Sequence, residues 1–252
     1  MTSGGGGSPP PAVTSGSAIL DAGTFAAGSA PILMYHAISD VPPGAAYSEL
    51  YVTPDDFAAE MAWLRSEGFE AVTLDDLYGA WHGKGNLPPK PIVISFDDGL
   101  QSQFTEALPI MRDMGWPGVL NLKIESLDQR ELTYAMVQRM IDAGWEIDSH
   151  TINHVDVTQL DAPALEHELA DSRRILQERF GVAVDFFCFP SGRFDRAAIA
   201  AVRDAGYVGA TTTLPGLATP SSNPFKLDRI RVELADGVPG LSTKLSQLAA
   251  SS

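Results

Sequence analysis

The sequence has one cysteine, no long hydrophobic run and few basic residues, and each shortage excludes a class of structure. Cys188 is the only cysteine among 252 residues, so neither an internal disulfide nor a thiolate-rich metal site can form. No apolar run approaches the roughly 20 residues of a membrane-spanning helix. The first basic residue is Arg65, so we expect no signal peptide with a positively charged start within this sequence.

Acidic residues outnumber basic ones by 32 to 17, which gives a net charge of -15 and a pI near 4.6. Such a protein repels phosphate, so we expect neither nucleic acid nor anionic lipid as a partner. The negative electrostatic potential of the protein is compatible with a cationic ligand or product. The need for solubility alone also accounts for a negative net charge.

Glycine, serine and proline dominate residues 1–30, which predicts a flexible tether. The sequence does not show whether this tether joins a membrane anchor to the domain or derives from an expression vector. Residues 31–252 have ordinary globular composition, and their length suits one catalytic domain.

From residue 31, short apolar runs alternate with amphipathic stretches, as in the strand-like 31–36 followed by the helix-like 53–68. About eight such units predict an α/β fold with parallel strands, which a chain of this length can close into a barrel. An open doubly wound sheet is the alternative, but no GxGxxG fingerprint follows any strand.

Reactive residues gather where the predicted strands end. In a parallel barrel these ends meet at one face, where active sites lie. The residues concerned are Tyr35 and His36, Asp97 and Asp98, His150 and His154, and Pro190 and Ser191.

Two histidines four residues apart, with one carboxylate, form a ligand set that leaves coordination positions open. Alone, "HTINH" also fits a polar loop, and "FDDG" also fits a turn. Together at the ends of two strands, they favour a catalytic metal site.

"ISFDDG" resembles the TFDDG signature of the NodB-type polysaccharide deacetylases, and "SHTINH" resembles their H[ST]xxH signature. The resemblance covers residues 31–232. It implies a distorted (β/α) barrel that removes acetyl groups from N-acetylated or O-acetylated sugars with a divalent metal. It also implies Asp98, His150 and His154 as metal ligands and Asp97 as general base.

Common family members take the general acid from a late histidine, which this sequence lacks. After His154 only His167 remains, in a helix where we expect a surface residue. "PILMYHAIS" instead resembles the opening of the branch that acts on poly-β-1,6-N-acetylglucosamine, whose motif order is circularly permuted. This resemblance implies His36 as the general acid; a packed or capping role is the alternative.

Two positions depart from the family pattern. Cys188 stands near the usual Arg, and Ser191 near a Tyr that contributes its backbone N–H. We assign Pro190, Ser191 and Arg231 to substrate binding, and expect Arg229 or Arg231 to replace the missing arginine beside Asp97. Cys188 is expected to be a buried strand residue.

The resemblance thus predicts metal-dependent hydrolysis of N-acetyl groups on a polysaccharide, with poly-β-1,6-N-acetylglucosamine as the preferred substrate. Chitin oligomers, peptidoglycan or an O-acetylated polymer are alternatives, as is an inactive carbohydrate-binding module. The ligand set suits zinc, and also cobalt, nickel or iron. The family and the tether together predict an exported protein, in the periplasm, in the cell envelope or secreted; no oligomeric state is predicted.

Overall fold

The structure, a computed structural model, describes residues 25–251. Residues 1–24 of the predicted tether lie outside this range, but residues 25–30 pack against the domain. Ala30 forms an antiparallel bridge with Ala218, and the indole Nε1 of Trp81 donates to the carbonyl of Gly28 at 2.6 Å. Residues 25–30 therefore contact the domain expected to begin at residue 31.

Eight parallel strands form the central sheet, in the order β10-β1-β5-β6-β7-β8-β9, with β4 pairing on β5. A two-stranded sheet, β2 with β3, lies beside it. The strands are β1 Ile32–Tyr35, β2 Ala37–Ile38, β3 Tyr51–Val52, β4 Glu70–Ala71, β5 Pro91–Asp97, β6 Val119–Leu122, β7 Glu146–Ser149, β8 Phe186–Cys188, β9 Gly209–Thr211 and β10 Ile230–Arg231.

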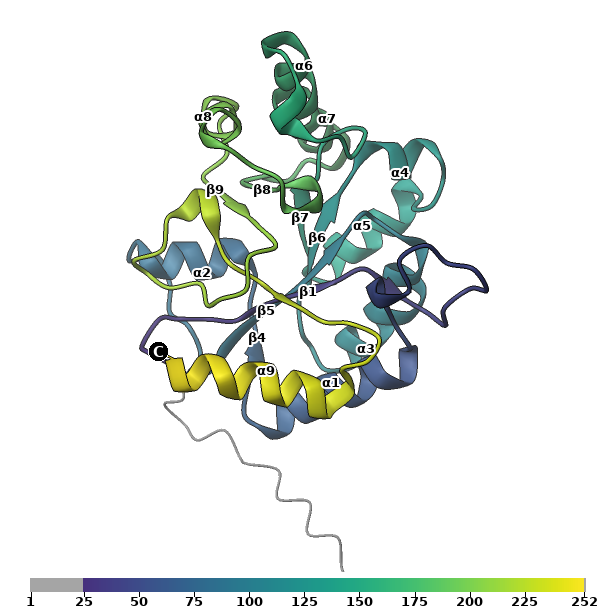
Figure 1. The fold of residues 1–252 in the computed structure, drawn as a ribbon, viewed down its shortest axis with the longest axis vertical. Helices are drawn as coiled ribbons and strands as arrows, with labels where there is room; N and C mark the ends of the chain where they lie inside the picture. The colour runs from purple at the N-terminus through teal and green to yellow at the C-terminus, as the bar shows by residue number, and fades with distance from the viewer. Residues whose placement is uncertain (1–24, 252) are drawn as a thin grey trace, which may run out of the picture.

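Helices surround the sheet, and the C-terminal α9 runs beside α1 (Figure 1). They are α1 Pro54–Ser66, α2 Leu74–Trp81, α3 Leu108–Asp113, α4 Ile124–Asp128, α5 Tyr134–Asp142, α6 Ala162–Glu166, α7 Ser172–Phe180, α8 Arg196–Asp204 and α9 Gly237–Ser251. Two π-helical turns, η2 Gln103–Ala107 and η4 His167–Asp171, lead into α3 and α7. None of the helices within residues 25–251 is both long enough and apolar enough to cross a membrane.

The segment from Leu227 to Arg231 closes the curled sheet. Leu227 exchanges backbone hydrogen bonds with the β9 side, donating to Ala210 O at 2.9 Å and accepting from Thr212 N at 2.9 Å. Ile230 and Arg231 then pair with β1. This irregular closure confirms the predicted distorted (β/α) barrel and the single α/β domain, and the open doubly wound sheet is not observed.

Side chains alternate between the two faces of the sheet as strand geometry requires. One face packs on the helices with residues such as Ile94, Phe96 and Leu120. The other face is apolar at the start of the strands, where Val93 and Val119 lie. It becomes polar toward their ends, so the active-site residues stand on an apolar floor.

A buried carboxyl group lies between α1 and β1. The hydroxyl of Tyr35 donates to Glu60 Oε2 at 2.8 Å, and both residues are fully buried. Burial raises the pKa of Glu60 to about 7; the Tyr35 hydrogen bond opposes this shift, and the nearby Asp236 adds to it. Folding therefore favours the protonated form of Glu60.

We expect Glu60→Gln to remove part of the pH dependence of stability. A raised pKa contributes stability that is fully present below the unfolded value near 4.5 and is lost as the pH rises through about 7. The wild type should lose about 3 kcal/mol relative to the variant between pH 4.5 and pH 8.5, from a shift of that size. Urea denaturation at both pH values measures the difference, with the exposed Glu70→Gln as the charge-matched control.

Candidate active site and metal centre

The turn after β5 sends two neighbouring aspartates in different directions. Asp97 is the last residue of β5, and Asp98 and Gly99 follow with φ of +78° and +75°. Aspartate is among the few residues that tolerate this left-handed conformation. A Cβ at position 99 would lie 2.4 Å from Leu122 Cδ1 and 3.3 Å from Ser126 Cβ, and the positive φ adds strain for any other residue, so glycine is favoured there.

Asp98, His150 and His154 converge on one point. Asp98 Oδ1 lies 3.6 Å from His150 Nε2 and 3.3 Å from His154 Nε2, and one ligand atom from each residue lies within 4.8 Å of the others. These are the three predicted metal ligands, and two imidazoles with one carboxylate form a donor set for a divalent transition metal.

The tautomer of His150 supports this use. Its Nδ1 lies 2.7 Å from the carbonyl oxygen of Cys188, which can only accept, so Nδ1 carries the proton. Its Nε2 therefore presents a lone pair, is buried, and has no hydrogen-bond partner among the described residues. A buried acceptor without a partner is costly, and a metal ion at this point would satisfy it. The residues fit the divalent metal that the ligand pattern predicts.

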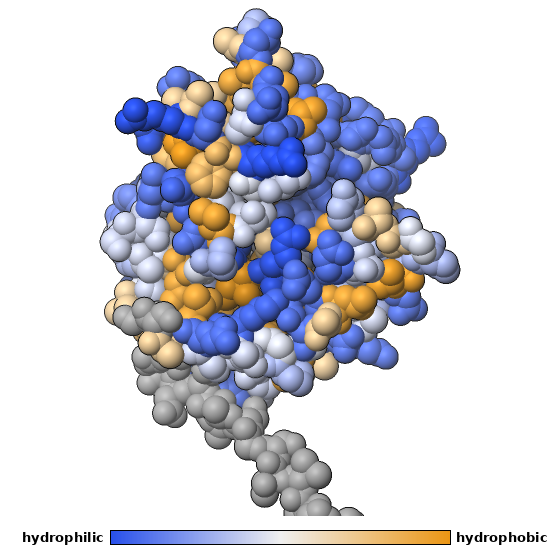
Figure 2. Space-filling model, in the orientation of Figure 1, coloured by the Kyte–Doolittle hydropathy of each residue, from blue (hydrophilic) through white to orange (hydrophobic). Residues whose placement is uncertain are grey.

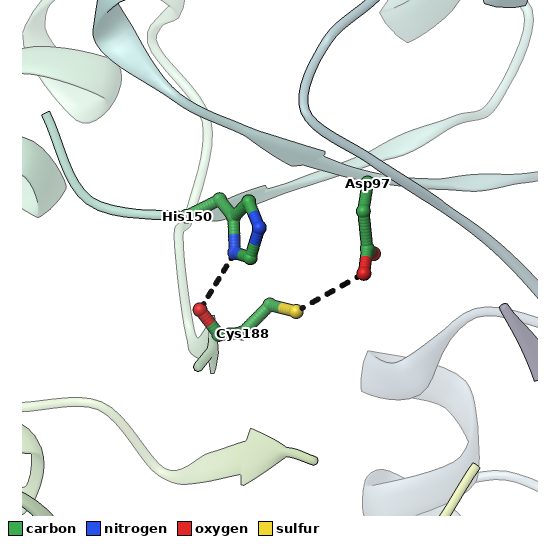
Figure 3. A group of neighbouring side chains, drawn as sticks. All are labelled: Asp97, His150 and Cys188. Carbon is green, nitrogen blue, oxygen red and sulfur yellow. Dashed lines mark hydrogen bonds between the residues drawn. The ribbon is translucent and has the colours of Figure 1, made fainter. Parts of the chain in front are cut away.

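A second group of potential ligands, Asp97, His150 and Cys188 (Figure 3), shares His150 with the first. This group fits a metal less well. Burial raises the pKa of the Cys188 thiol, and the Nδ1 of His150 already donates to the Cys188 carbonyl. Both oxygens of Asp97 are held by Arg229, so the set around Asp98 is the better candidate.

Arg229 holds Asp97 through two parallel hydrogen bonds, Nη1 to Oδ1 at 2.7 Å and Nη2 to Oδ2 at 2.8 Å. Asn121 Nδ2 adds a bond to Oδ1 at 2.7 Å, and the Cys188 thiol points at Oδ2 from 3.6 Å. Burial raises the pKa of Asp97, but the guanidinium outweighs it and holds the pKa well below its usual range. Of the two arginines that the sequence leaves open, Arg229 is thus the partner of Asp97.

His36 faces the same carboxylate from β1. Its Nε2 lies 3.9 Å from Asp97 Oδ2, and its side chain is 12% exposed. Burial lowers the pKa of His36, while the charges of Asp97 and Asp98 act in the opposite direction. The predicted acid and the predicted base therefore stand side by side.

These residues line a groove of about 750 Å³. Of the three residues predicted to bind substrate, Ser191 and Arg231 line it, whereas Pro190 is buried and does not belong to the lining that the described residues form. The groove also contains residues for which the sequence analysis predicts no role: Tyr47, Glu49, Leu50, Lys123, Glu125, Asn153, Arg193 and Thr213. Hydrophilic residues cover much of the face seen in Figure 2, with hydrophobic patches between them.

A buried carboxylate supports the loop between the two histidine ligands. Glu168 accepts hydrogen bonds from Ile152 N at 2.8 Å, Asn153 N at 3.1 Å and Asn153 Nδ2 at 2.7 Å. The loop needs this support because Thr151 and His154 both have positive φ. The sequence analysis misses Glu168, although it places the neighbouring His167 correctly at the surface, where it pairs with Asp171.

Comparison with known proteins places the chain in one family. A sequence profile described as Polysaccharide deacetylase matches residues 84–210, half of the chain. Bacillus subtilis YxkH, which bears the name of a polysaccharide deacetylase, is 29% identical over 213 residues, or 84% of this chain and 72% of its own length. Streptococcus pyogenes deacetylase PplD, solved in complex with acetate, matches with a TM-score of 0.80 and 25% identity over 86% of this chain and 98% of that chain. A Staphylococcus aureus poly-beta-1,6-N-acetyl-D-glucosamine N-deacetylase is 22% identical over 202 residues, 72% of this chain and 67% of its own.

Replacing Arg229 by lysine should slow acetyl hydrolysis more than it weakens metal binding. Lysine keeps the charge but cannot make the two parallel bonds to Asp97. We expect the rate of acetate release to fall about 100-fold, the cost of small misplacements in active sites. Arg196→Lys, at an exposed position in α8 outside the groove, is the matched control; equal losses in the two variants would contradict a special role for Arg229.

Glu168→Gln should weaken the metal centre without touching a ligand. Glutamine has one acceptor oxygen in place of two, so either the two backbone N–H groups that share Oε2 or the Asn153 Nδ2 group at Oε1 loses its acceptor, and the loop loses part of its support. We expect zinc affinity to fall about 10- to 100-fold, as for other residues that orient metal ligands. Competition titration against a fluorescent chelator measures it, with the exposed Glu166→Gln on the same helical segment as control. Unchanged affinity in Glu168→Gln would show that the loop holds its shape alone.

Proposed function

Because the chain belongs to the polysaccharide deacetylase family, we propose that it hydrolyses the N-acetyl groups of a polysaccharide that contains N-acetylglucosamine. One observation carries the proposal: an ionised Asp97 lies beside the convergent Asp98, His150 and His154 in a single groove. A sugar-binding module has no need for a carboxylate held by four donors next to a set of metal ligands. We therefore favour an active enzyme over an inactive module.

Asp98, His150 and His154 would hold a divalent ion, for which zinc is our first choice. When bound, such an ion would supply a lowered pKa for a water molecule and a positive charge to balance developing negative charge. Asp97 accepts the proton of the attacking water, and Arg229 keeps its carboxylate ionised and correctly oriented for that transfer. The water oxygen becomes part of acetate, and the bond between the acetyl carbon and the sugar nitrogen breaks.

The departing amine needs a proton, and His36 is placed to deliver it. The imidazole lies in the groove wall, with Nε2 turned toward Asp97. Since burial lowers the pKa of His36, the ring is neutral before the reaction and gains its proton during the cycle. Asp97, 3.9 Å away, is the nearby group from which that proton can come. Overall, one water is consumed, and one acetate and one free amine are formed.

The groove is large enough for several sugar units of a polymer. Its volume of about 750 Å³ exceeds that of one sugar ring, and both Ser191 and Arg231 reach it from the chain segments that follow β8 and form β10. Among polymers, we propose poly-β-1,6-N-acetylglucosamine, supported by the Staphylococcus aureus relative and by the histidine that follows β1. A polymer of this kind belongs to the cell envelope or to its surroundings, so the proposal also places the protein outside the cytoplasm.

Acetate release from β-1,6 and β-1,4 oligomers of N-acetylglucosamine tests the function. The chelated enzyme should be inactive, and added zinc should restore release. Asp97→Asn should lower the rate by about 10²- to 10⁴-fold, the usual contribution of a general base. Faster release from the β-1,6 oligomer would support the proposed linkage.

His36→Gln separates the acid from the base. We expect it to bind zinc normally and to lose most activity on amide substrates, while it retains more activity on an acetyl ester whose leaving group needs no proton. Release from the β-1,4 oligomer alone would redirect the proposal to chitin-like polymers. No release from either oligomer by zinc-loaded enzyme would overturn it.

A further inference from the structure

One buried side chain connects the backbones of the proposed acid and base. Gln103 is fully buried, and its amide nitrogen donates to the carbonyl of Asp97 at 2.6 Å and to the carbonyl of His36 at 3.0 Å. Its Oε1 accepts from Leu100 N at 3.1 Å. Both amide hydrogens and the amide oxygen are therefore engaged, which fixes the orientation of the side chain.

The two carbonyls lie where the sheet no longer holds β1 and β5 together. The register between these strands ends at the pair Tyr35 and Phe96, one residue before His36 and Asp97. Beyond it the chains separate, since Ala37 and Ile38 pair with β3 and Asp98 begins the left-handed turn. Gln103 bridges the strands at the position where the next backbone hydrogen bonds would stand.

The backbone conformation at Gln103 explains how it reaches this point. Gln103 is the first residue of η2, and a π-helical turn contains one more residue than an α-helical turn. From this turn the Gln103 side chain reaches the carbonyls of His36 and Asp97, and π-helical turns are frequent at functional sites. The neighbouring Ser102 makes a separate contact, accepting from Ile38 N at 3.0 Å through its Oγ.

We propose that Gln103 is a positioning residue that sets the separation between His36 and Asp97, an inference that rests on the proposed function of these two residues. By holding both carbonyls, the amide fixes the two backbones from which the imidazole and the carboxylate project. The 3.9 Å between His36 Nε2 and Asp97 Oδ2 follows from this connection and from the Arg229 pair. Gln103 does not line the groove, and the three hydrogen bonds of its side chain go to backbone atoms, so it acts on the reaction through the backbone that it holds.

Gln103→Met tests the proposal, because methionine has a similar length and no donor. We expect kcat for acetate release to fall about 100-fold, as for a misplacement of about 1 Å. KM should stay within about threefold, and each chain should still bind one zinc. Ser102→Ala, which removes the neighbouring contact to Ile38 N, is the matched control and should keep wild-type kcat.

Gln103→Glu provides a second variant if Gln103→Met does not fold. It keeps the length and the acceptor for Leu100 N but has at most one donor in place of two, so at least one of the two carbonyls loses its bond and kcat should fall. A crystal structure of either variant should show the distance from His36 Nε2 to Asp97 Oδ2 changed by about 1 Å or more. A folded, zinc-loaded variant with kcat within threefold of wild type, or with the distance unchanged, overturns the proposal.

The two proposals fail differently. If the wild type releases no acetate, the proposed function is wrong; if Asp97→Asn and His36→Gln are fully active, the roles of base and acid are wrong. In either case the crystal structures alone still decide whether Gln103 sets the distance. If those variants are inactive and Gln103→Met has wild-type kcat, the proposed function stands and only the positioning role falls.

Discussion

The contact between Arg229 and Asp97 is the interaction on which the rest of the site depends. Arg229 lies in the segment that joins β9 to β1, and Asp97 ends β5, so the ion pair crosses the mouth of the barrel. A fully buried ion pair adds little net stability, because desolvation of two charges offsets their attraction. Its value here is geometric. It holds the carboxylate with both oxygens engaged while the adjacent Asp98 turns toward the histidines.

The charge of Arg229 can lie at this depth because the N–H groups of its guanidinium find acceptors inside the barrel. Arg229 donates to the carbonyl of Thr212 at 2.8 Å and to Ser95 Oγ at 3.2 Å, in addition to Asp97. Unsatisfied donors at this depth would cost about 1–3 kcal/mol each. The apolar floor at Val93 and Val119 keeps water out from below, which strengthens each charge-assisted bond above it. The starts of the strands thus contribute apolar packing, and their ends carry the polar residues of the site.

The strand ends could be predicted because strand and turn chemistry is local. An apolar run that stops at two aspartates and a glycine indicates both the strand and the turn, and the barrel brings distant strand ends to one face. The partner of Asp97 could not be predicted, because Arg229 and Arg231 are two residues apart and point to the same side of an extended segment. Only the folded barrel shows that Arg229 reaches Asp97 whereas Arg231 lines the groove. The roles of Gln103 and Glu168 could not be predicted from the sequence for another reason. Both lie in π-helical turns, where the extra residue shifts the 100° periodicity on which a sequence pattern depends. Asn121 did leave a signal, as a single amide within the apolar run "VLNL".

The departure at position 188 becomes intelligible once Arg229 is seen beside it. The family pattern has an arginine near this position, at the end of β8, whereas this chain has Cys188. Arg229 Nη2 lies 3.2 Å from Cys188 Sγ, so a side chain as large as arginine at position 188 would occupy the space that the Arg229 guanidinium fills. An arginine next to β10 therefore requires a small residue at position 188 on β8. The constraint that the reaction imposes is a guanidinium at a given place beside the carboxylate, and a closed barrel lets more than one strand supply it.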